Sequence, residues 1–142
     1  YGCDEVINYS KEDFAKKVME LTDGKGVSVV YDGVGKSTYD KSIECLKLRG
    51  TMVSFGNASG ALDPIIVSKS LQPKGIYFVR PAMNQYFTNS EEIHEAANML
   101  FKQISSGNVK IEIYKKYKLE DAVQAHKDLE GRKITGPAVI IP

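Results

Sequence analysis

The feature that most constrains the fold is an alternation of short β-branched runs with amphipathic helical windows along the chain. The clearest run is Val27–Asp32, and its near-continuous apolar character predicts a strand covered on both faces. A helix is predicted over 37–47, and Thr51–Phe55 is the next predicted strand. Alternation of this kind is typical of βαβ units around a mostly parallel sheet.

Further elements follow from the same periodicities. The other predicted strands are Val6–Tyr9, Ile76–Arg80, Ile111–Tyr114 and Ala138–Ile141. Ser10 is predicted to cap a helix, with Asp13 as its capping-box partner. A long helix is predicted to begin after Asn89 or Ser90 and to bury Ile93, Ala97, Leu100, Phe101 and Ile104. The last predicted helix runs over 119–130 and buries Leu119, Val123, His126 and Leu129.

The bulk composition excludes several classes of protein. The chain has 142 residues, which suits one domain with a real core. A formal net charge of +1 creates no strong field for nucleic acid or for an anionic membrane, and no apolar run is long enough to span a bilayer. The start of the chain has neither the basic nor the apolar region of a signal peptide. Cys3 and Cys45 are expected to be free thiols, and we expect a cytoplasmic protein.

Two glycine-rich segments follow predicted strands. Gly33-Val34-Gly35 comes after Asp32, and Gly56-Asn57-Ala58-Ser59-Gly60 comes after Phe55. In an open parallel sheet, ligands bind beyond the carboxyl ends of the strands, and glycine lets backbone N–H groups approach a phosphate or a flat ring. Strand-to-helix turns need glycine as well, so the pattern alone leaves a ligand site and a plain turn both open. The chain contains no GxGxxG fingerprint.

Other candidate sites are weaker. His94 and His126 lie on different predicted helices, so we predict no metal site. Asp32 at a strand end could be the phospho-acceptor of a receiver domain, but that fold needs further acidic residues near its first strand, and here they are only a loose match. A basic and aromatic cluster could bind nucleic acid, although a solvated sheet edge is favoured at this net charge; its members are Tyr114, Lys115, Lys116, Tyr117 and Lys118.

Several segments occur in the order and spacing of a known family. They are Val6–Tyr9, Gly24–Val27, Val30–Gly35, Val53–Gly60 and Leu129–Gly136. In these segments the chain resembles the zinc-free quinone oxidoreductases of the zeta-crystallin type, within the medium-chain dehydrogenase/reductase superfamily. The resemblance covers essentially the whole chain, and the run from Ser54 to Gly60 is its most specific part. It implies an α/β fold with an incomplete doubly wound parallel (Rossmann-type) sheet that lacks its first strands and glycine fingerprint.

The same resemblance implies a domain organisation and an activity. The chain would be the C-terminal part of the nucleotide-binding domain, following a catalytic domain and the first βαβ unit. The implied reaction passes reducing equivalents from NADPH to a quinone without a metal. No acid–base pair stands out, so no catalytic residue is predicted, and the chain alone is expected to be inactive. The alternative is a non-enzymatic α/β module with an RNA-binding or interaction role.

Residue by residue, the resemblance implies an NADPH site. Tyr9 would lie beside the adenosine end of the cofactor, and Gly33 and Val34 would border its ribose and pyrophosphate. Arg132 would reach back with its guanidinium, which suits a phosphate. The nicotinamide half would be held by Phe55, Gly56, Asn57, Ala58 and Ser59. The chain departs from the family at Gly33, where a serine or another small residue is common, and at Pro137, where a residue with a backbone donor is usual.

The strand Ile76–Arg80 carries an expectation about assembly. In a sheet of order 3-2-1-4-5-6 it is the sixth strand and lies at an edge. It is apolar and strongly β-prone, with its only charge at the end, whereas edge strands are usually blunted by charges, prolines or bulges. We therefore expect a homodimer through this strand, as in the resembled family. The alternative is a monomer in which the segment after Pro81 folds over the edge.

Overall fold

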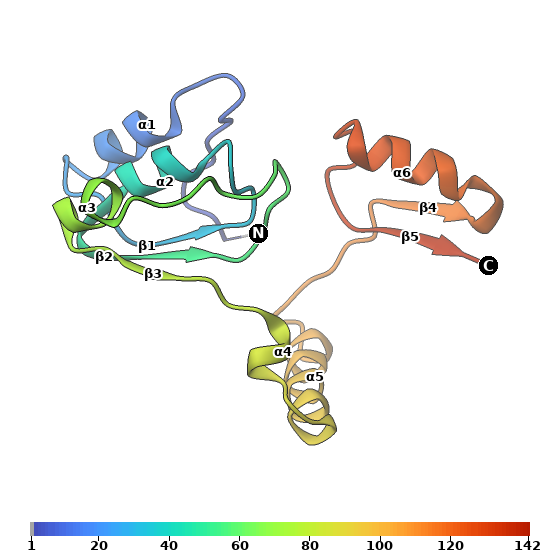
Figure 1. Ribbon diagram of the computed structural model, residues 1–142. Helices are drawn as coiled ribbons and strands as arrows, with labels where there is room; N and C mark the ends of the chain where they lie inside the picture. The colour runs from blue at the N-terminus through green and yellow to red at the C-terminus, as the bar shows by residue number, and fades with distance from the viewer. Residues whose placement is uncertain (1) are drawn as a thin grey trace. The chain divides into compact units, whose positions relative to one another are not determined.

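The computed structural model describes residues 2–142, which form two compact units, one ending at Tyr86 and the other covering Phe87–Pro142 (Figure 1). The first unit contains α1 (Phe14–Leu21), β1 (Val27–Asp32), α2 (Tyr39–Glu44), β2 (Leu46–Ser54), α3 (Val67–Ser70), the 3-10 turn η1 (Gln72–Lys74), β3 (Tyr77–Val79) and α4 (Met83–Tyr86). The second contains α5 (Ser90–Ser105), β4 (Lys115–Lys118), η2 (Leu119–Asp121), α6 (Ala122–Glu130) and β5 (Ala138–Ile141). That both units belong to one nucleotide-binding domain stays a prediction.

The first unit is built on a parallel sheet of order β1-β2-β3. Val30 pairs with Met52, and Met52 with Phe78, so these side chains form one row across the sheet. The prediction of parallel α/β architecture is confirmed, and so is the strand Val27–Asp32. Among the described strands, β3 pairs only with β2 and lies at an edge, as expected.

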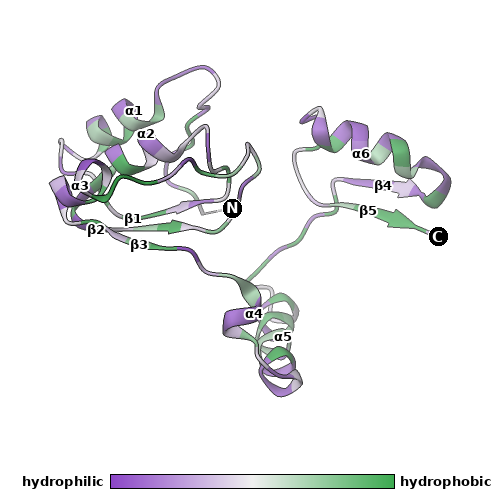
Figure 2. Ribbon diagram, viewed as in Figure 1, coloured by the Kyte–Doolittle hydropathy of each residue, from purple (hydrophilic) through white to green (hydrophobic). Residues whose placement is uncertain are grey.

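The core of this unit lies between the sheet and its helices. α1 and α2 cover the same face of the sheet (Figure 1). Leu46 and Met52 on that face are each only 1% exposed, and Figure 2 shows the hydrophobic character of β3. On the opposite face, Tyr31 is 73% and Tyr77 66% exposed. The expectation that β1 is covered on both faces is therefore wrong within this unit, because its helices lie on one side.

The N-terminal segment differs from its prediction. Residues Val6–Tyr9 form no strand, because no described strand lies beside them to accept and donate ladder hydrogen bonds. Ser10 does not cap α1 either. The cap is Asp13, whose Oδ1 accepts hydrogen bonds from the N–H groups of Ala15 and Lys16.

The second helix is shorter than predicted and the second strand longer. α2 ends at Glu44 and β2 begins at Leu46, whereas the helix was expected to continue to residue 47. At this junction Lys74 Nζ donates to the carbonyl oxygens of Glu44 (2.8 Å) and Leu46 (2.7 Å). These carbonyls face a cation instead of further helical N–H groups, and the side chain of Leu46 enters the core.

The second unit contains a βαβ motif in which β4 and β5 pair in parallel and α6 connects them. The strand predicted at Ile111–Tyr114 is wrong, because the strand lies at Lys115–Lys118. Figure 2 shows the reason for the error: β5 is hydrophobic but β4 is hydrophilic. Only Tyr117 of β4 is buried, at 6% exposure, so β4 lacks the apolar alternation that the prediction used.

The buried faces of α5 and α6 were also predicted wrongly. α6 buries Ala125 and Asp128, whereas the expected residues are exposed: Leu119, Val123, His126 and Leu129. A small alanine lets the helix approach the sheet, and Asp128 reaches Tyr117. α5 begins after its predicted cap Asn89 but has no buried residue. Of its expected stripe, Ala97 and Ile104 are half-buried, and the exposed members are Ile93, Leu100 and Phe101.

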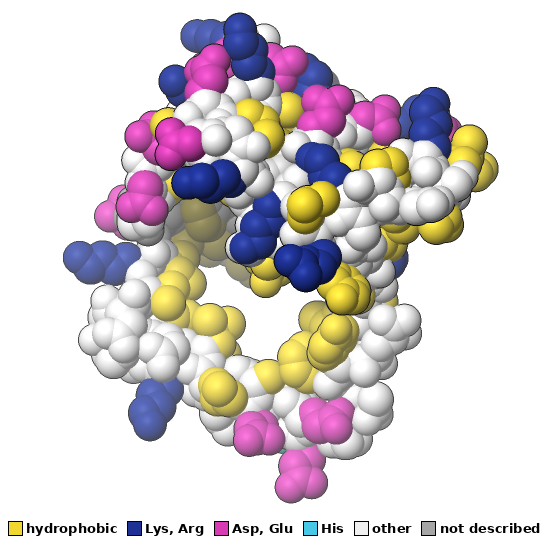
Figure 3. Space-filling view, turned by 90° about the vertical axis from the view of Figure 1, so that its left-hand side faces the viewer, with side chains coloured by type: hydrophobic (Ala, Val, Ile, Leu, Met, Phe, Trp, Pro, Cys, Tyr) yellow, Lys and Arg dark blue, Asp and Glu magenta, His cyan; other side chains and the backbone are white. Residues whose placement is uncertain are grey.

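Apolar side chains are consequently frequent at the surface. Figure 3 shows them in yellow on one face of the molecule, lying between charged groups. No helix formed by residues 2–142 is long and apolar enough to cross a membrane.

The packing of β2 predicts a sharp contrast between two leucines. Leu46→Ala should lower the free energy of unfolding by about 2–5 kcal/mol, because it leaves a cavity in the core. Leu48→Ala should change it by less than about 0.5 kcal/mol, because Leu48 is 66% exposed. Urea unfolding followed by circular dichroism measures both values, and equal costs would contradict the proposed core.

Candidate functional site at the carboxyl edge of the sheet

The two glycine-rich loops that follow β1 and β2 are joined by backbone hydrogen bonds. The N–H of Phe55 donates to the carbonyl oxygen of Asp32 (2.9 Å). The backbone N–H and the hydroxyl of Ser59 both donate to the carbonyl oxygen of Val34, at 2.7 Å each. The N–H of Ala58 donates to the carbonyl oxygen of Gly33 (3.3 Å). The structure thus brings the predicted residues 33–34 and 55–59 together in one double loop.

The glycines of the double loop are needed by the loop packing itself. A Cβ on Gly56 would overlap the carbonyl oxygen of Gly33. Gly35 has a φ of +89°, and a Cβ there would lie 2.8 Å from the carbonyl oxygen of Gly60. A Cβ on Gly33 would lie 2.9 Å from the ring of Phe55. The turn reading of the glycine pattern is therefore confirmed, because Gly35 and Gly56 have no room for a Cβ, while the ligand-site reading stays a prediction.

A buried carboxylate organises the turn after β1. Asp32 is only 5% exposed, and its Oδ1 accepts hydrogen bonds from the N–H groups of Val34 (2.8 Å) and Gly35 (2.9 Å). Its Oδ2 accepts from the hydroxyls of Thr38 and Ser42, at 2.8 Å each. Burial opposes ionisation, but these hydrogen bonds outweigh it and hold the pKa of Asp32 below its ordinary value. With both oxygens occupied by donors, Asp32 is not placed as a phospho-acceptor.

The outer surface of the double loop offers groups that a ligand could use. The ring of Phe55 is 55% exposed. Asn57 is exposed, and its carboxamide has no hydrogen-bond partner within residues 2–142. Beside the loop lies a pocket of about 340 Å³, whose lining includes Tyr9, Gly33 and Val34. The structure thus places Tyr9 near the other predicted residues of the first unit.

Arg132 belongs to the second unit, so its contact with the double loop stays a prediction. It lies in a turn after α6 with a φ of 54°, and its N–H donates to the carbonyl oxygen of Leu129 (3.1 Å). The next residue, Lys133, donates its N–H to the carbonyl oxygen of Asp128 (2.9 Å). Contacts to Asp128 and Leu129 therefore hold the backbone on both sides of Arg132.

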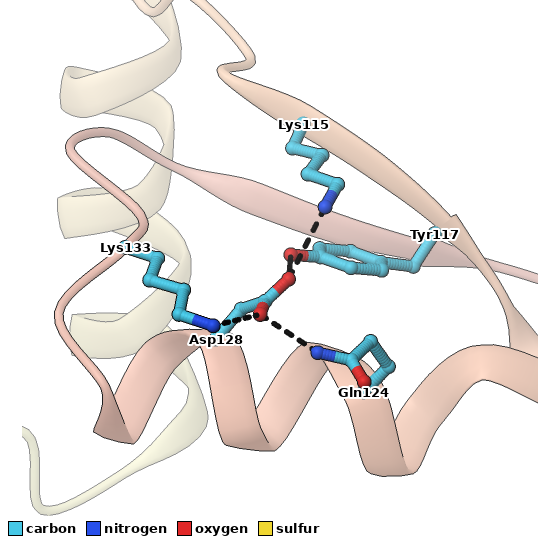
Figure 4. A network of polar contacts seen from close by, with 5 residues as sticks. All are labelled: Lys115, Tyr117, Gln124, Asp128 and Lys133. Carbon is cyan, nitrogen blue, oxygen red and sulfur yellow. Dashed lines mark hydrogen bonds and ion pairs between the residues drawn. The ribbon is translucent and has the colours of Figure 1, made fainter.

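Asp128 is the centre of a polar network (Figure 4). Its carboxylate accepts hydrogen bonds from Tyr117 Oη (2.8 Å), Gln124 Nε2 (2.8 Å) and Lys115 Nζ (3.2 Å). The hydrogen bonds from Tyr117, Lys115 and Gln124 lower the pKa of Asp128 to about 2. Because Tyr117 is buried and Lys115 is paired, the basic cluster around β4 lacks a central ring on which a base could stack.

Sequence reasoning missed both buried carboxylates in these roles. For Asp32 a signal exists: Thr38 and Ser42 are four residues apart, so their hydroxyls share one side of α2. For Asp128 the local signal is Gln124, four residues earlier on α6, whereas Tyr117 and Lys115 reach it from β4.

The described residues offer neither a cluster of metal ligands nor an activated thiol. Within residues 2–142, no group of three or more His, Cys, Asp or Glu side chains is arranged to hold a metal ion. Independence from metal stays a prediction. Cys45 is free and buried, and burial raises the pKa of its thiol to about 11, so it is a poor nucleophile at neutral pH.

Comparison with known proteins gives consistent matches. The profile of the zinc-binding dehydrogenase family matches residues 1–140. Quinone oxidoreductase 1 of Escherichia coli strain K12 is 44% identical over 143 residues, which covers 99% of this chain and 44% of that protein. The 2-haloacrylate reductase of a Burkholderia species is also 44% identical, over 142 residues, which covers 99% of this chain and 43% of that protein.

A solved structure extends the match to the fold. The crystal structure of Escherichia coli quinone oxidoreductase complexed with NADPH has a TM-score of 0.92 and 44% identity, covering 99% of this chain and 44% of that one. The Rossmann-type fold and the resemblance inferred from the sequence are confirmed. The chain spans less than half the length of these relatives.

The network around Asp128 predicts a measurable titration. Because the pKa is lowered from 3.8 to about 2, ionised Asp128 stabilises the fold above pH 3.8, and this contribution is lost as the pH falls towards 2. Tyr117→Phe removes the largest cause and should raise the pKa towards its ordinary value. Tyr114→Phe, at an exposed tyrosine, should leave it unchanged. Carboxyl NMR titration measures the pKa, and an unmoved value in Tyr117→Phe would disprove the network.

Proposed function

Because the chain belongs to the zinc-binding dehydrogenase family, we propose that it is the C-terminal part of an NADPH-dependent quinone oxidoreductase of the medium-chain dehydrogenase/reductase superfamily. The observation that carries the proposal is the 44% identity, over 99% of the chain, to a quinone oxidoreductase whose crystal structure is a complex with NADPH. The catalytic domain and the first βαβ unit would be contributed by the rest of the protein.

The double loop fits the nicotinamide half of the cofactor. A flat ring can lie against backbone that carries no Cβ, and the carboxamide of Asn57 offers both a donor and an acceptor. Phe55, Gly56, Asn57, Ala58 and Ser59 are therefore proposed to hold this half. Bound NADPH would supply the reducing equivalents, and these residues would orient the ring and exclude water from one of its faces.

For the rest of the cofactor, this chain is proposed to supply only some of the contacts. Gly33 and Val34 would border the ribose and pyrophosphate, with Tyr9 towards the adenosine. Arg132 would approach from the second unit and pair with a phosphate. The main pyrophosphate donors are expected elsewhere in the protein, because this chain has no GxGxxG segment.

The proposed reaction requires little general acid catalysis from the residues of this chain. A quinone gains aromaticity on reduction, so it needs little help from a general acid. The match to a 2-haloacrylate reductase at the same 44% identity makes an activated alkene the competing acceptor. We favour the quinone, because the Escherichia coli quinone oxidoreductase structure matches with a TM-score of 0.92, whereas the structure of 2-haloacrylate reductase matches with 0.83. The alternative of an RNA-binding module has no support from these matches or from the basic cluster.

Activity of the complete protein tests this proposal. NADPH oxidation should depend on a quinone and proceed faster than with 2-haloacrylate, and a chelator should leave the rate unchanged. The 142-residue chain alone should be inactive, because the pyrophosphate donors and the catalytic domain are expected outside it. Faster turnover of 2-haloacrylate than of a quinone would make an activated alkene the proposed acceptor. Loss of activity on chelation would refute independence from metal.

We also propose a cytoplasmic homodimer that pairs through the strand Ile76–Arg80. In support, β3 has a neighbouring strand on one side only within the described chain. The exposed aromatic Tyr77 and the half-buried Phe78 make this an apolar edge. Free Cys3 and Cys45 agree with a reducing compartment.

A charge on the exposed face of β3 tests the pairing. Tyr77→Lys should split the dimer, because it places like charges close to a two-fold axis. A lysine at Phe78 would be less informative, since Phe78 packs against Tyr39 in the core. Leu48→Lys, at an exposed position of β2, is the matched control and should remain dimeric. Light scattering gives the answer, and a monomeric wild type or a dimeric Tyr77→Lys would exclude this interface.

A further inference from the structure

We propose that Asp32 is a positioning residue for the nicotinamide site: it fixes the turn after β1, and through that turn the double loop, while protein donors occupy both of its carboxylate oxygens. This inference rests on the proposed function, because it assumes that the double loop holds NADPH. It adds a residue that the resemblance did not place in the site, and it assigns a physical cause to the shape of that site.

Donors from the turn after β1 and from the start of α2 converge on the carboxylate of Asp32. Val34 and Gly35 present backbone N–H groups to Oδ1, while Thr38 and Ser42 present hydroxyls to Oδ2. The strand end, the turn and the first turn of α2 are thereby fixed to a single group. The hydroxyl of Thr38 lies also 3.1 Å from Oδ1, so the two halves of the arrangement share a donor.

Hydrogen bonds of Val34 couple the turn after β1 to the loop after β2. Val34, fixed through its N–H, accepts two hydrogen bonds from Ser59 through its carbonyl oxygen. In return, the hydroxyl of Ser59 accepts from the N–H of Ser37 (3.0 Å), and the carbonyl oxygen of Gly60 accepts from the N–H of Lys36 (3.2 Å). A shift of the turn after β1 must therefore move the loop that carries the proposed nicotinamide contacts.

The charge of Asp32 strengthens this arrangement. A carboxylate that is 5% exposed is stable only when its hydrogen-bonding capacity is filled, and hydrogen bonds to an ionised acceptor are about twice as strong as neutral ones. Asp32→Asn keeps the shape but removes the charge. Its carbonyl oxygen can still accept from Val34 and Gly35, while its amide can donate to the hydroxyls of Thr38 and Ser42. This variant should fold, with a looser turn.

The experiment combines two measurements. In the complete protein, Asp32→Asn should raise the Kd for NADPH, measured by calorimetry, and the KM for NADPH by about tenfold. Its kcat should change less, and its melting temperature should stay within a few degrees of wild type. Ser42→Ala, which removes one donor, should raise both constants by about two- to fivefold. Ser28→Ala, at an exposed position of β1, is the control and should change neither.

The second measurement needs no cofactor. Amide hydrogen exchange in the complete protein without NADPH should show faster exchange at Val34, Gly35 and Ser59 in Asp32→Asn than in wild type, with the amides of β2 unchanged. A merely structural role would lower the folded fraction and leave the KM for NADPH as it is.

The outcomes separate the two proposals. A wild-type protein that does not bind NADPH overturns both the function and this inference. A wild type that binds, together with an Asp32→Asn variant whose Kd and exchange rates match it, overturns the inference alone. Faster exchange with an unchanged Kd also overturns it, because the loop would then be ordered by Asp32 without serving the cofactor.

Discussion

The hydrogen bonds to the buried carboxylate of Asp32 are the constraint on which the carboxyl edge of the first unit depends. They hold the turn after β1 against α2, and Val34 passes this order to the loop after β2. The glycines let the two loops approach until backbone meets backbone. The result is a surface that owes its shape to one charge and to the absence of side chains, and the proposed nicotinamide contacts are built on it.

The second unit uses a similar device. Asp128 is 7% exposed, and its carboxylate gathers donors from β4 and α6, while its backbone carbonyl oxygen accepts the N–H of Lys133 in the turn that carries Arg132. In both units a buried carboxylate therefore collects several donors, and in the first unit these include the backbone beside residues that are proposed to meet the cofactor. A single buried carboxylate is suited to this role, because an ionised acceptor can hold several donors at once and hydrogen bonds to it are strong.

The sequence was informative where local pattern and tertiary burial agree. Val27–Asp32 was predicted to the residue, and the loops after the first two strands were found from their glycines. It failed where a partner decides the outcome: Val6–Tyr9 lacks a neighbouring strand, and β4 is held by its pairing with β5 despite its lysines. The buried face of α6 was missed because a pattern search favours leucine and valine over Ala125 and Asp128. The hydrogen-bonding role of Asp128 was missed because Tyr117 and Lys115 reach it from β4, and that of Asp32 because turn N–H groups and hydroxyls leave no mark on an apolar periodicity.

The central claim is that the double loop is a preformed contact surface for the nicotinamide half of NADPH. The most direct measurement is an NADPH titration of the isotope-labelled complete protein, followed by its amide NMR signals. The account predicts that the largest shifts within this chain fall on Gly33, Phe55, Gly56 and Asn57, and that the amide of Leu48 on the same sheet does not shift. Tight binding of NADPH with no shift at the double loop would contradict the claim.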